Sequence, residues 1–84
     1  MTLKILYFAS LREALGQASE NIDLPAQIAN VGQLQAHLIA RGEAWEALCK
    51  TKNLRVAINQ QMAALDAPVK DGDEVAFFPP VTGG

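Results

Sequence analysis

The sequence predicts an α+β domain in which one main helix packs on one face of a mixed sheet of about five strands. Two segments near the ends of the chain, residues 2–8 and 74–78, are apolar on both faces, which is typical of central strands. Between them, the segment from residue 30 to 42 has apolar residues at helical spacing, a helix start signal and a helix stop signal, which predict the main helix. Shorter alternating segments at 18–24 and 54–58 complete most of the sheet.

The N-terminal third is predicted to form two antiparallel strands joined by a short helix. In residues 2–8 one face carries Leu3, Ile5 and Tyr7, and the other carries Lys4, Leu6 and Phe8. Ser10 and Glu13 match a helix capping box, and Gly16 is placed to end this helix. Alternation resumes over residues 18–24, so we expect the second strand there.

The main helix is predicted to begin after Asn30, a residue that favours the N-cap position. Its apolar stripe consists of Val31, Leu34 and Leu38. Gly42 is the predicted stop signal. A further helical turn over residues 43–49 is expected to place Trp45 and Leu48 against the core.

The C-terminal part is predicted to contain a half-buried strand at 54–58, a short returning strand at 62–65 and a last strand at 74–78. Residues 59–61 form the predicted turn between the first two. The order is then strand, strand, helix, strand, short strand, strand. If the apolar strands from the two chain ends pair in parallel at the sheet centre, this order is the β-grasp, or ubiquitin-like, arrangement.

One helix covers one face of a sheet, and strand alternation predicts large apolar residues on the other face. Leu6, Phe8 and Phe78 fall on that face, and Met62 can join them. Single apolar residues on a surface are normal, but a contiguous patch on a small protein typically marks an interaction site. We therefore predict a partner-docking surface formed by Phe8, Met62 and Phe78.

Composition excludes several classes of function. A net charge of −2 with 19% charged residues gives no basic surface for nucleic acid. The apolar run that follows Lys4 is too short to span a membrane, so we expect a cytoplasmic protein without a membrane partner. The single cysteine, Cys49, and the single histidine, His37, form neither an internal disulfide nor a metal site. No bound cofactor is expected, and both residues are expected to be unreactive surface groups.

The end of the sequence differs in composition from the rest. The prolines at 79 and 80 cannot continue a hydrogen-bonded strand, so residues 79–84 are predicted to be an extended tail of a single domain spanning 1–84. Gly83 and Gly84 can enter a slot too narrow for any other residue. The tail is either a frayed terminus or a functional segment that presents the main-chain carboxylate of Gly84.

Nearly the whole chain resembles the molybdopterin synthase small-subunit family of ubiquitin-like sulfur carriers. The most specific element is the ending Phe77-Phe78-Pro79-Pro80-Val81-Thr82-Gly83-Gly84. The resemblance extends to Leu6-Tyr7-Phe8-Ala9, Arg12-Glu13, Ala57-Ile58-Asn59-Gln60 and Asp71-Gly72-Asp73-Glu74. Tyr7 departs from the phenylalanine that is frequent in this family, and residues 43–52 lie in a variable region.

This resemblance implies the sulfur-donating subunit of a sulfurtransferase in molybdenum cofactor biosynthesis. An E1-like adenylating enzyme would use ATP to activate the Gly84 carboxylate. A sulfur donor, such as a cysteine desulfurase or a rhodanese-type protein, would then supply the sulfur of a thiocarboxylate. The tail would insert into the large subunit through Val81, Thr82 and Gly83 and donate sulfur to cyclic pyranopterin monophosphate, forming the molybdopterin dithiolene. Acid–base groups would belong to the large subunit, and the family assembly is a heterotetramer.

Three alternatives keep the fold but change the function. The same carrier chemistry would serve thiamine thiazole synthesis or tRNA thiolation, although the segment Phe77-Phe78-Pro79-Pro80 argues against a thiazole carrier. A protein modifier would use the terminal carboxylate to form isopeptide bonds with lysine side chains. A plain interaction module would have an inert tail, so that removing Gly83 and Gly84 would change nothing.

Overall fold

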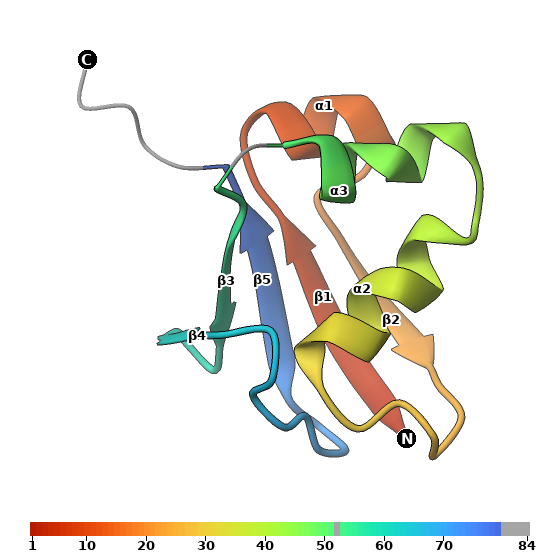
Figure 1. Cartoon of the computed structure of the whole chain (residues 1–84), viewed down its shortest axis with the longest axis vertical. Coiled ribbons are helices and arrows are strands. Elements are labelled where there is room, and N and C mark those ends of the chain that lie inside the picture. Colours follow the sequence, from red (N-terminus) through yellow and green to blue (C-terminus); the bar gives the residue numbers. More distant parts are fainter. Residues whose placement is uncertain (52, 80–84) are drawn as a thin grey trace.

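The computed structural model describes residues 1–51 and 53–79, and its centre is a five-stranded sheet with helices against one face (Figure 1). The elements in chain order are β1 (Thr2–Tyr7), α1 (Ser10–Leu15), β2 (Ser19–Asp23), α2 (Val31–Ile39), η1 (Glu43–Glu46), α3 (Ala47–Lys50), β3 (Arg55–Ile58), β4 (Gln61–Ala63) and β5 (Glu74–Phe78). Apart from small differences in the ends of the elements, this is the predicted order.

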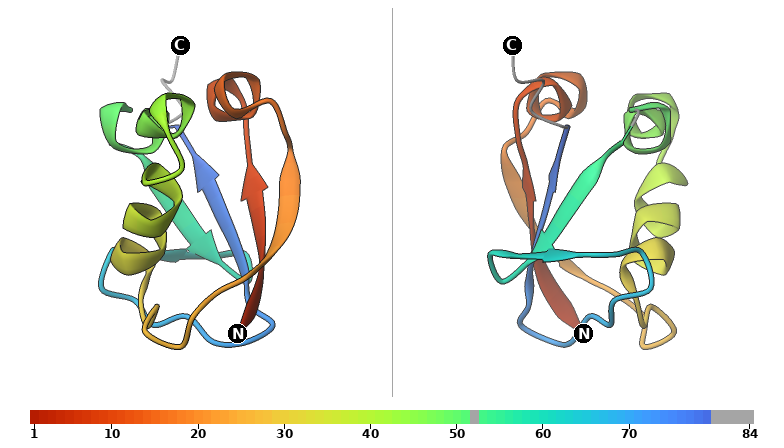
Figure 2. Two further views of the ribbon diagram at one scale, coloured as in Figure 1. Left: turned by 90° about the vertical axis from the view of Figure 1, so that its right-hand side faces the viewer. Right: turned by 60° about the vertical axis from the view of Figure 1, so that its left-hand side comes forward.

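The strand order β2-β1-β5-β3-β4 confirms the predicted β-grasp arrangement. β1 and β5 come from opposite ends of the chain, yet they lie side by side and in parallel. β1 pairs antiparallel with β2, and β3 pairs antiparallel with both β5 and β4. Figure 2 shows α2 packed across one face of this sheet.

Strand alternation sorts the side chains of β1 and β5 between the two faces of the sheet as predicted. The side chains that point toward α2 are Leu3, Ile5, Tyr7, Val75 and Phe77, and none of them is more than 1% exposed. They form one core with Val31, Leu34 and Leu38 of α2 and Leu48 of α3. Burial of this apolar surface is the main force that holds the helix layer on the sheet.

α1 begins differently from the prediction. Ser10 is the first helical residue, and Ala9 takes the N-cap position with a positive φ of 54°. No side chain caps this helix, so the predicted capping box of Ser10 and Glu13 is wrong. The reason is the sharp turn out of β1, where the Leu11 N–H donates to the Phe8 carbonyl (3.1 Å). Gly16 ends the helix in the left-handed conformation (φ 73°), as predicted.

α2 has the predicted N-terminus, because Asn30 Oδ1 accepts a hydrogen bond from the Gln33 N–H (2.9 Å). Its last residue is Ile39 and its C-cap is Ala40, so the helix ends slightly before the predicted stop at Gly42. Gly42 instead begins the turn into η1, where its carbonyl accepts from the Trp45 N–H (3.0 Å).

The β3–β4 connection is a two-residue turn at Asn59 and Gln60, with φ values of 50° and 71°. Two consecutive positive φ values are typical of a type I′ hairpin turn. β4 ends at Ala63 and is shorter than the predicted strand at 62–65. It ends there because the chain turns toward α2, where the Leu65 carbonyl accepts from the Gly32 N–H (2.8 Å).

A polar cluster joins β1, β2 and the chain after α2, and the sequence did not predict it. The Tyr7 hydroxyl donates to Glu20 Oε2 (2.8 Å), and the Arg41 guanidinium donates to both Glu20 oxygens (3.0 and 2.8 Å). That guanidinium also lies 4.6 Å from the centre of the Trp45 ring. Burial, reinforced by the hydrogen bond to Glu20, raises the pKa of Tyr7 well above its ordinary value, so this phenol stays protonated as a structural donor.

Candidate functional site

The sheet face opposite α2 carries an apolar row that crosses four strands. Strand register places Leu6, Ala76, Ala57 and Met62 next to one another. Residues in register on neighbouring strands point to the same face. Met62 is 59% exposed, whereas Ala57 is only 8% exposed because its small side chain lies between those of Ala76 and Met62. This row is therefore a continuous apolar strip on the molecular surface.

A second row lies at the end of the sheet where β5 ends. Phe78 is in register with Arg55 of β3, and its ring meets that of Phe8 edge to face, with ring centroids 6.4 Å apart. The Phe8 N–H donates to the Phe77 carbonyl (3.2 Å), which holds the chain beyond β1 against β5. Phe8 is 45% exposed.

We call the two rows together the uncovered face. Its residues are Leu6, Phe8, Arg55, Ala57, Met62, Ala76 and Phe78. The predicted placement of Phe8, Met62 and Phe78 on the face opposite the main helix is confirmed. Their role in docking a partner stays a prediction.

Arg55 is the charged residue of the uncovered face, and the sequence alone did not assign it to that face. Its alternation with Val56, which is buried on the helix side, was the available signal. Alternation does not show which residue lies next to Arg55. That neighbour is Phe78, and only the pairing of β3 with β5 brings the two residues together.

The predicted tail residues Val81, Thr82, Gly83 and Gly84 lie outside the described residues, as does Pro80. The described chain ends at Pro79, directly after β5. β5 is a central strand, hydrogen-bonded to β1 on one side and to β3 on the other. The point from which residues 80–84 continue is therefore fixed to the core of the sheet, at the same end as Phe8 and Arg55.

At the other end of β5, two segments that carry the family resemblance meet. Asn59 Nδ2 donates to Asp73 Oδ1 (3.0 Å), and Asn59 Oδ1 accepts from the Glu74 N–H (3.0 Å). The second Asp73 oxygen accepts from the Lys70 N–H (2.8 Å). These contacts attach the β3–β4 turn to the start of β5, so the role of these residues is structural.

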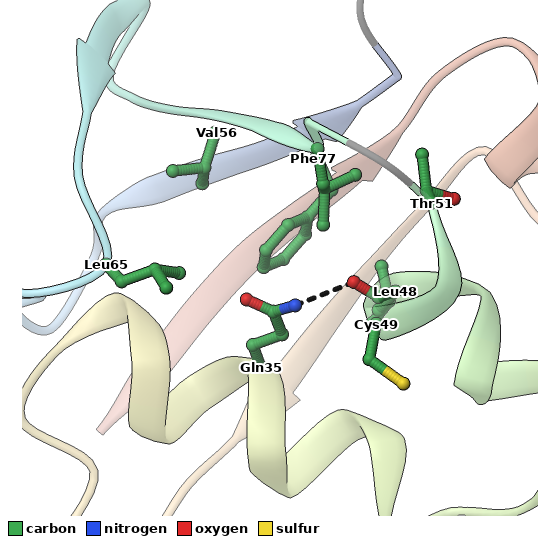
Figure 3. A pocket seen from close by; sticks show the side chains of 8 residues that line it. Gln35, Leu48, Cys49, Thr51, Val56, Leu65 and Phe77 are labelled. Atoms are coloured by element: carbon green, nitrogen blue, oxygen red, sulfur yellow. Dashed lines mark hydrogen bonds between the residues drawn. The ribbon is translucent and has the colours of Figure 1, made fainter.

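An open cleft of about 280 Å³ lies on the helix side of the sheet (Figure 3). It is lined by Gln35, Leu48, Cys49, Thr51, Leu54, Val56, Leu65 and Phe77. The Gln35 side chain donates to the Leu48 carbonyl (2.7 Å), as Figure 3 shows. Cys49 is exposed at this cleft, and His37 is exposed on α2.

Residues 1–51 and 53–79 show neither a candidate metal site nor a membrane-spanning helix. They contain no group of three or more His, Cys, Asp and Glu side chains that could hold a metal ion. No helix in the same ranges is both long and apolar enough to cross a membrane.

This chain combines a β-grasp sheet with the sequence Gly83-Gly84 after the central strand β5. That combination is typical of the class of ubiquitin-like carrier proteins. Residues 5–84 match the ThiS family, so the chain belongs to that family. It is 40% identical over 82 residues to the molybdopterin synthase sulfur carrier subunit of Escherichia coli (strain K12). The aligned region covers 98% of this chain and 99% of that protein. The protein of the same name from Haemophilus influenzae is 43% identical over 82 residues, with the same two coverages of 98% and 99%.

The fold is also shared with a solved structure, the small archaeal modifier protein 1 of Haloferax volcanii. The two structures superpose with a TM-score of 0.79 at 28% sequence identity, over 95% of this chain and 98% of the other. Within the ThiS family, the two bacterial relatives place this chain with the sulfur carriers of molybdenum cofactor biosynthesis.

Proposed function

We propose that this chain is the sulfur-carrier subunit of a molybdopterin synthase and that the carboxylate of Gly84 carries the sulfur as a thiocarboxylate. The observation that carries the proposal is the family match, which spans residues 5–84 and so includes the tail. The two bacterial relatives, each matched over 98% of this chain, bear the name of that subunit.

The chemistry requires activation of the carboxylate by a partner. A terminal carboxylate, with an ordinary pKa of about 3.3–3.7, is ionised at neutral pH and is a poor electrophile. An E1-like adenylating enzyme joins it to the AMP part of ATP and releases pyrophosphate. The outer sulfur of a persulfide on a donor, such as a cysteine desulfurase or a rhodanese-type protein, then displaces AMP and forms an acyl disulfide. A second thiol of the partner proteins cleaves the S–S bond, which releases the thiocarboxylate and leaves a disulfide on the partner. None of these steps needs a side chain of this protein, which binds no cofactor in the proposed cycle.

The thiocarboxylate is a nucleophile that attacks cyclic pyranopterin monophosphate in the active site of the large subunit. Val81, Thr82 and Gly83 enter that site as part of the tail. After each attack, water cleaves the resulting thioester, which leaves the sulfur on the pterin and restores the Gly84 carboxylate. Two such transfers build the dithiolene. The uncovered face docks on the large subunit, because it is apolar, exposed and next to the start of the tail. The proposed assembly, in the cytoplasm, is a large-subunit dimer with one small subunit at each end.

The test is the mass of the protein after incubation with its activating enzyme, ATP and a sulfur donor. We expect a product in which one oxygen is replaced by sulfur, with the change located at Gly84 by fragmentation of the C-terminal peptide. Omitting ATP is the control, and it should leave the mass unchanged. A product with sulfur elsewhere in the chain, or no product with a competent activating enzyme, would contradict the proposal.

A second candidate function is a protein modifier, favoured by the structural likeness to the small archaeal modifier protein 1 of Haloferax volcanii. A modifier would form an isopeptide bond between its terminal carboxylate and a lysine of another protein. Intact-mass spectra of the protein from cells distinguish the two functions, because a modifier yields adducts of much higher mass than the thiocarboxylate form.

Cys49→Ser and His37→Ala are expected to retain full sulfur transfer. Both side chains are exposed on the helix layer, on the other side of the sheet from the uncovered face. The measurement is the rate of molybdopterin formation in a reconstituted system, with the unmodified chain as the reference. A persulfide on Cys49 that is required for transfer would show that the carrier group is the thiol rather than the Gly84 carboxylate.

A further inference from the structure

Charged side chains lie at both ends of the uncovered face, but only one end is internally compensated. At the end near the start of β1, Lys4 and Glu74 are in register, with Lys4 Nζ 4.0 Å from Glu74 Oε2. At the end where β5 stops, Arg55 is exposed. Within residues 1–51 and 53–79, no carboxylate forms an ion pair with it.

Arg55 is part of the docking surface rather than a neighbour of it. Val56 is buried on the helix side, so Arg55 and Ala57 point to the opposite face. Arg55 is also in register with Phe78, which packs on Phe8. A partner that covers this aromatic pair and receives the tail beyond Pro79 therefore also covers Arg55.

Covering Arg55 removes water from its guanidinium group, and this is costly unless the partner supplies an acceptor. A carboxylate suits this position, because the planar guanidinium donates two parallel hydrogen bonds to its two oxygens. The chain as a whole has a net charge of −2, whereas Arg55 has no ion pair among residues 1–51 and 53–79 and gives this end of the docking surface a positive charge.

We propose that Arg55 is a specificity-determining residue of the docking surface and that it recognises a carboxylate of the molybdopterin synthase large subunit beside the entrance for the tail. This inference rests on the proposed function, since it assumes that the large subunit covers the uncovered face. The large subunit is the chosen partner because the two bacterial relatives are named as a subunit of molybdopterin synthase, and Arg55 lies beside the end of β5, from which the tail continues.

The test measures binding of purified large subunit to Arg55→Gln, Arg55→Glu and Arg55→Lys at low and high salt. We expect Arg55→Gln and Arg55→Glu to dissociate about tenfold faster, because losing one partner of a covered charge pair leaves the other unpaired and acts mainly on the dissociation rate. Arg55→Glu should also slow association at low salt, because its reversed charge repels the partner's carboxylate. The difference in association rate should shrink at high salt, where such charges are screened. Arg55→Lys should restore most of the association rate but dissociate faster, because it keeps the charge without the two parallel hydrogen bonds.

Lys50→Glu is the matched control. Lys50 is an exposed cation on α3, on the helix side of the sheet, and its reversal changes the net charge by the same amount. We expect it to bind the large subunit as the unmodified chain does. Thermal melting of the three Arg55 variants should match the unmodified chain, because Arg55 is exposed and makes no side-chain hydrogen bond within the described residues. Lys50→Glu loses the exposed ion pair with Glu46 (3.0 Å), and such a surface pair contributes about 1 kcal/mol or less.

Failure of this inference is distinguishable from failure of the proposed function. If the unmodified chain binds the large subunit and makes molybdopterin, but Arg55→Gln and Arg55→Glu bind with unchanged rates and salt dependence, the role of Arg55 is overturned and the proposed function stands. If Arg55→Glu impairs only adenylation, the carboxylate belongs to the activating enzyme and the assignment to the large subunit is overturned. If the unmodified chain neither binds the large subunit nor accepts sulfur, the proposed function itself fails.

Discussion

Adding one residue after Gly84, or deleting Gly84, is expected to abolish molybdopterin formation. One added residue moves the terminal carboxylate by about 3.4 Å and places a side chain where only glycine fits. Productive geometry holds the reacting atoms about 3–3.5 Å apart, so a displacement of that size prevents adenylation or sulfur transfer. Fold and docking should remain largely intact, because the described core and the uncovered face are built from residues before 80.

The measurement is reconstitution with purified large subunit, activating enzyme, ATP, a sulfur donor and the pterin precursor. An N-terminal tag is the control. Met1 lies at the start of β1, which runs parallel to β5, and is therefore remote from the end of β5. Its amino group forms an ion pair with the exposed Asp23 carboxylate (3.3 Å) and donates to the Leu24 carbonyl (3.1 Å). These contacts lie away from the uncovered face, so a tag there should be tolerated if it does not cover that face. Normal product formation by a C-terminally extended chain, with the extension still attached, would refute the sulfur-carrier mechanism.

Phe77→Ala is expected to lower the free energy of unfolding by about 3–5 kcal/mol, the usual cost of removing a fully packed aromatic side chain. Phe77 is fully buried, and its ring stacks on that of Tyr7 with centroids 6.4 Å apart. Because a small domain has a total stability of only roughly 5–15 kcal/mol, this single change removes a large part of it. Val75→Ala should destabilise the fold for the same reason, since Val75 is also fully buried.

Phe78→Ala is the matched control, because it removes the same side chain from the next position of β5. Phe78 is partly exposed on the uncovered face and packs on Phe8. We expect this variant to melt near the unmodified chain but to bind the large subunit more weakly. Chemical denaturation gives the unfolding free energies, and titration with the large subunit gives the affinities. A severe loss of stability in Phe78→Ala with a mild loss in Phe77→Ala would reverse the assignment of the two faces.

The proposed chemistry of the tail comes from the sequence and the family match, since residues 80–84 lie outside the described residues. The structure contributes the position from which the tail starts. It also places Phe8, Phe78 and Arg55 around that position. These three residues therefore define the proposed docking surface beside the start of the tail, and substitutions in them can test it.

Much of the fold could be predicted from the sequence alone, because the patterns that specify its strands and helices lie in neighbouring residues. Alternation along β1 and β5 specifies which side chains are buried, and the helical spacing of Val31, Leu34 and Leu38 specifies the buried stripe of α2. Asn30 and Gly16 act through hydrogen bonds or backbone conformations within one helical turn. A pattern of neighbouring residues contains this information without reference to the rest of the chain.

Only the tertiary structure decided the features that depend on partners distant in sequence. The start of α1 follows from the turn at Ala9, and the end of β4 follows from the contact of Leu65 with Gly32. Glu20 joins Tyr7 and Arg41 across 13 and 21 positions of the sequence. Alternation assigns Arg55 to a face of the sheet, but strand register alone gives it Phe78 as a neighbour. That register results from packing the whole core at once, so no local pattern encodes it.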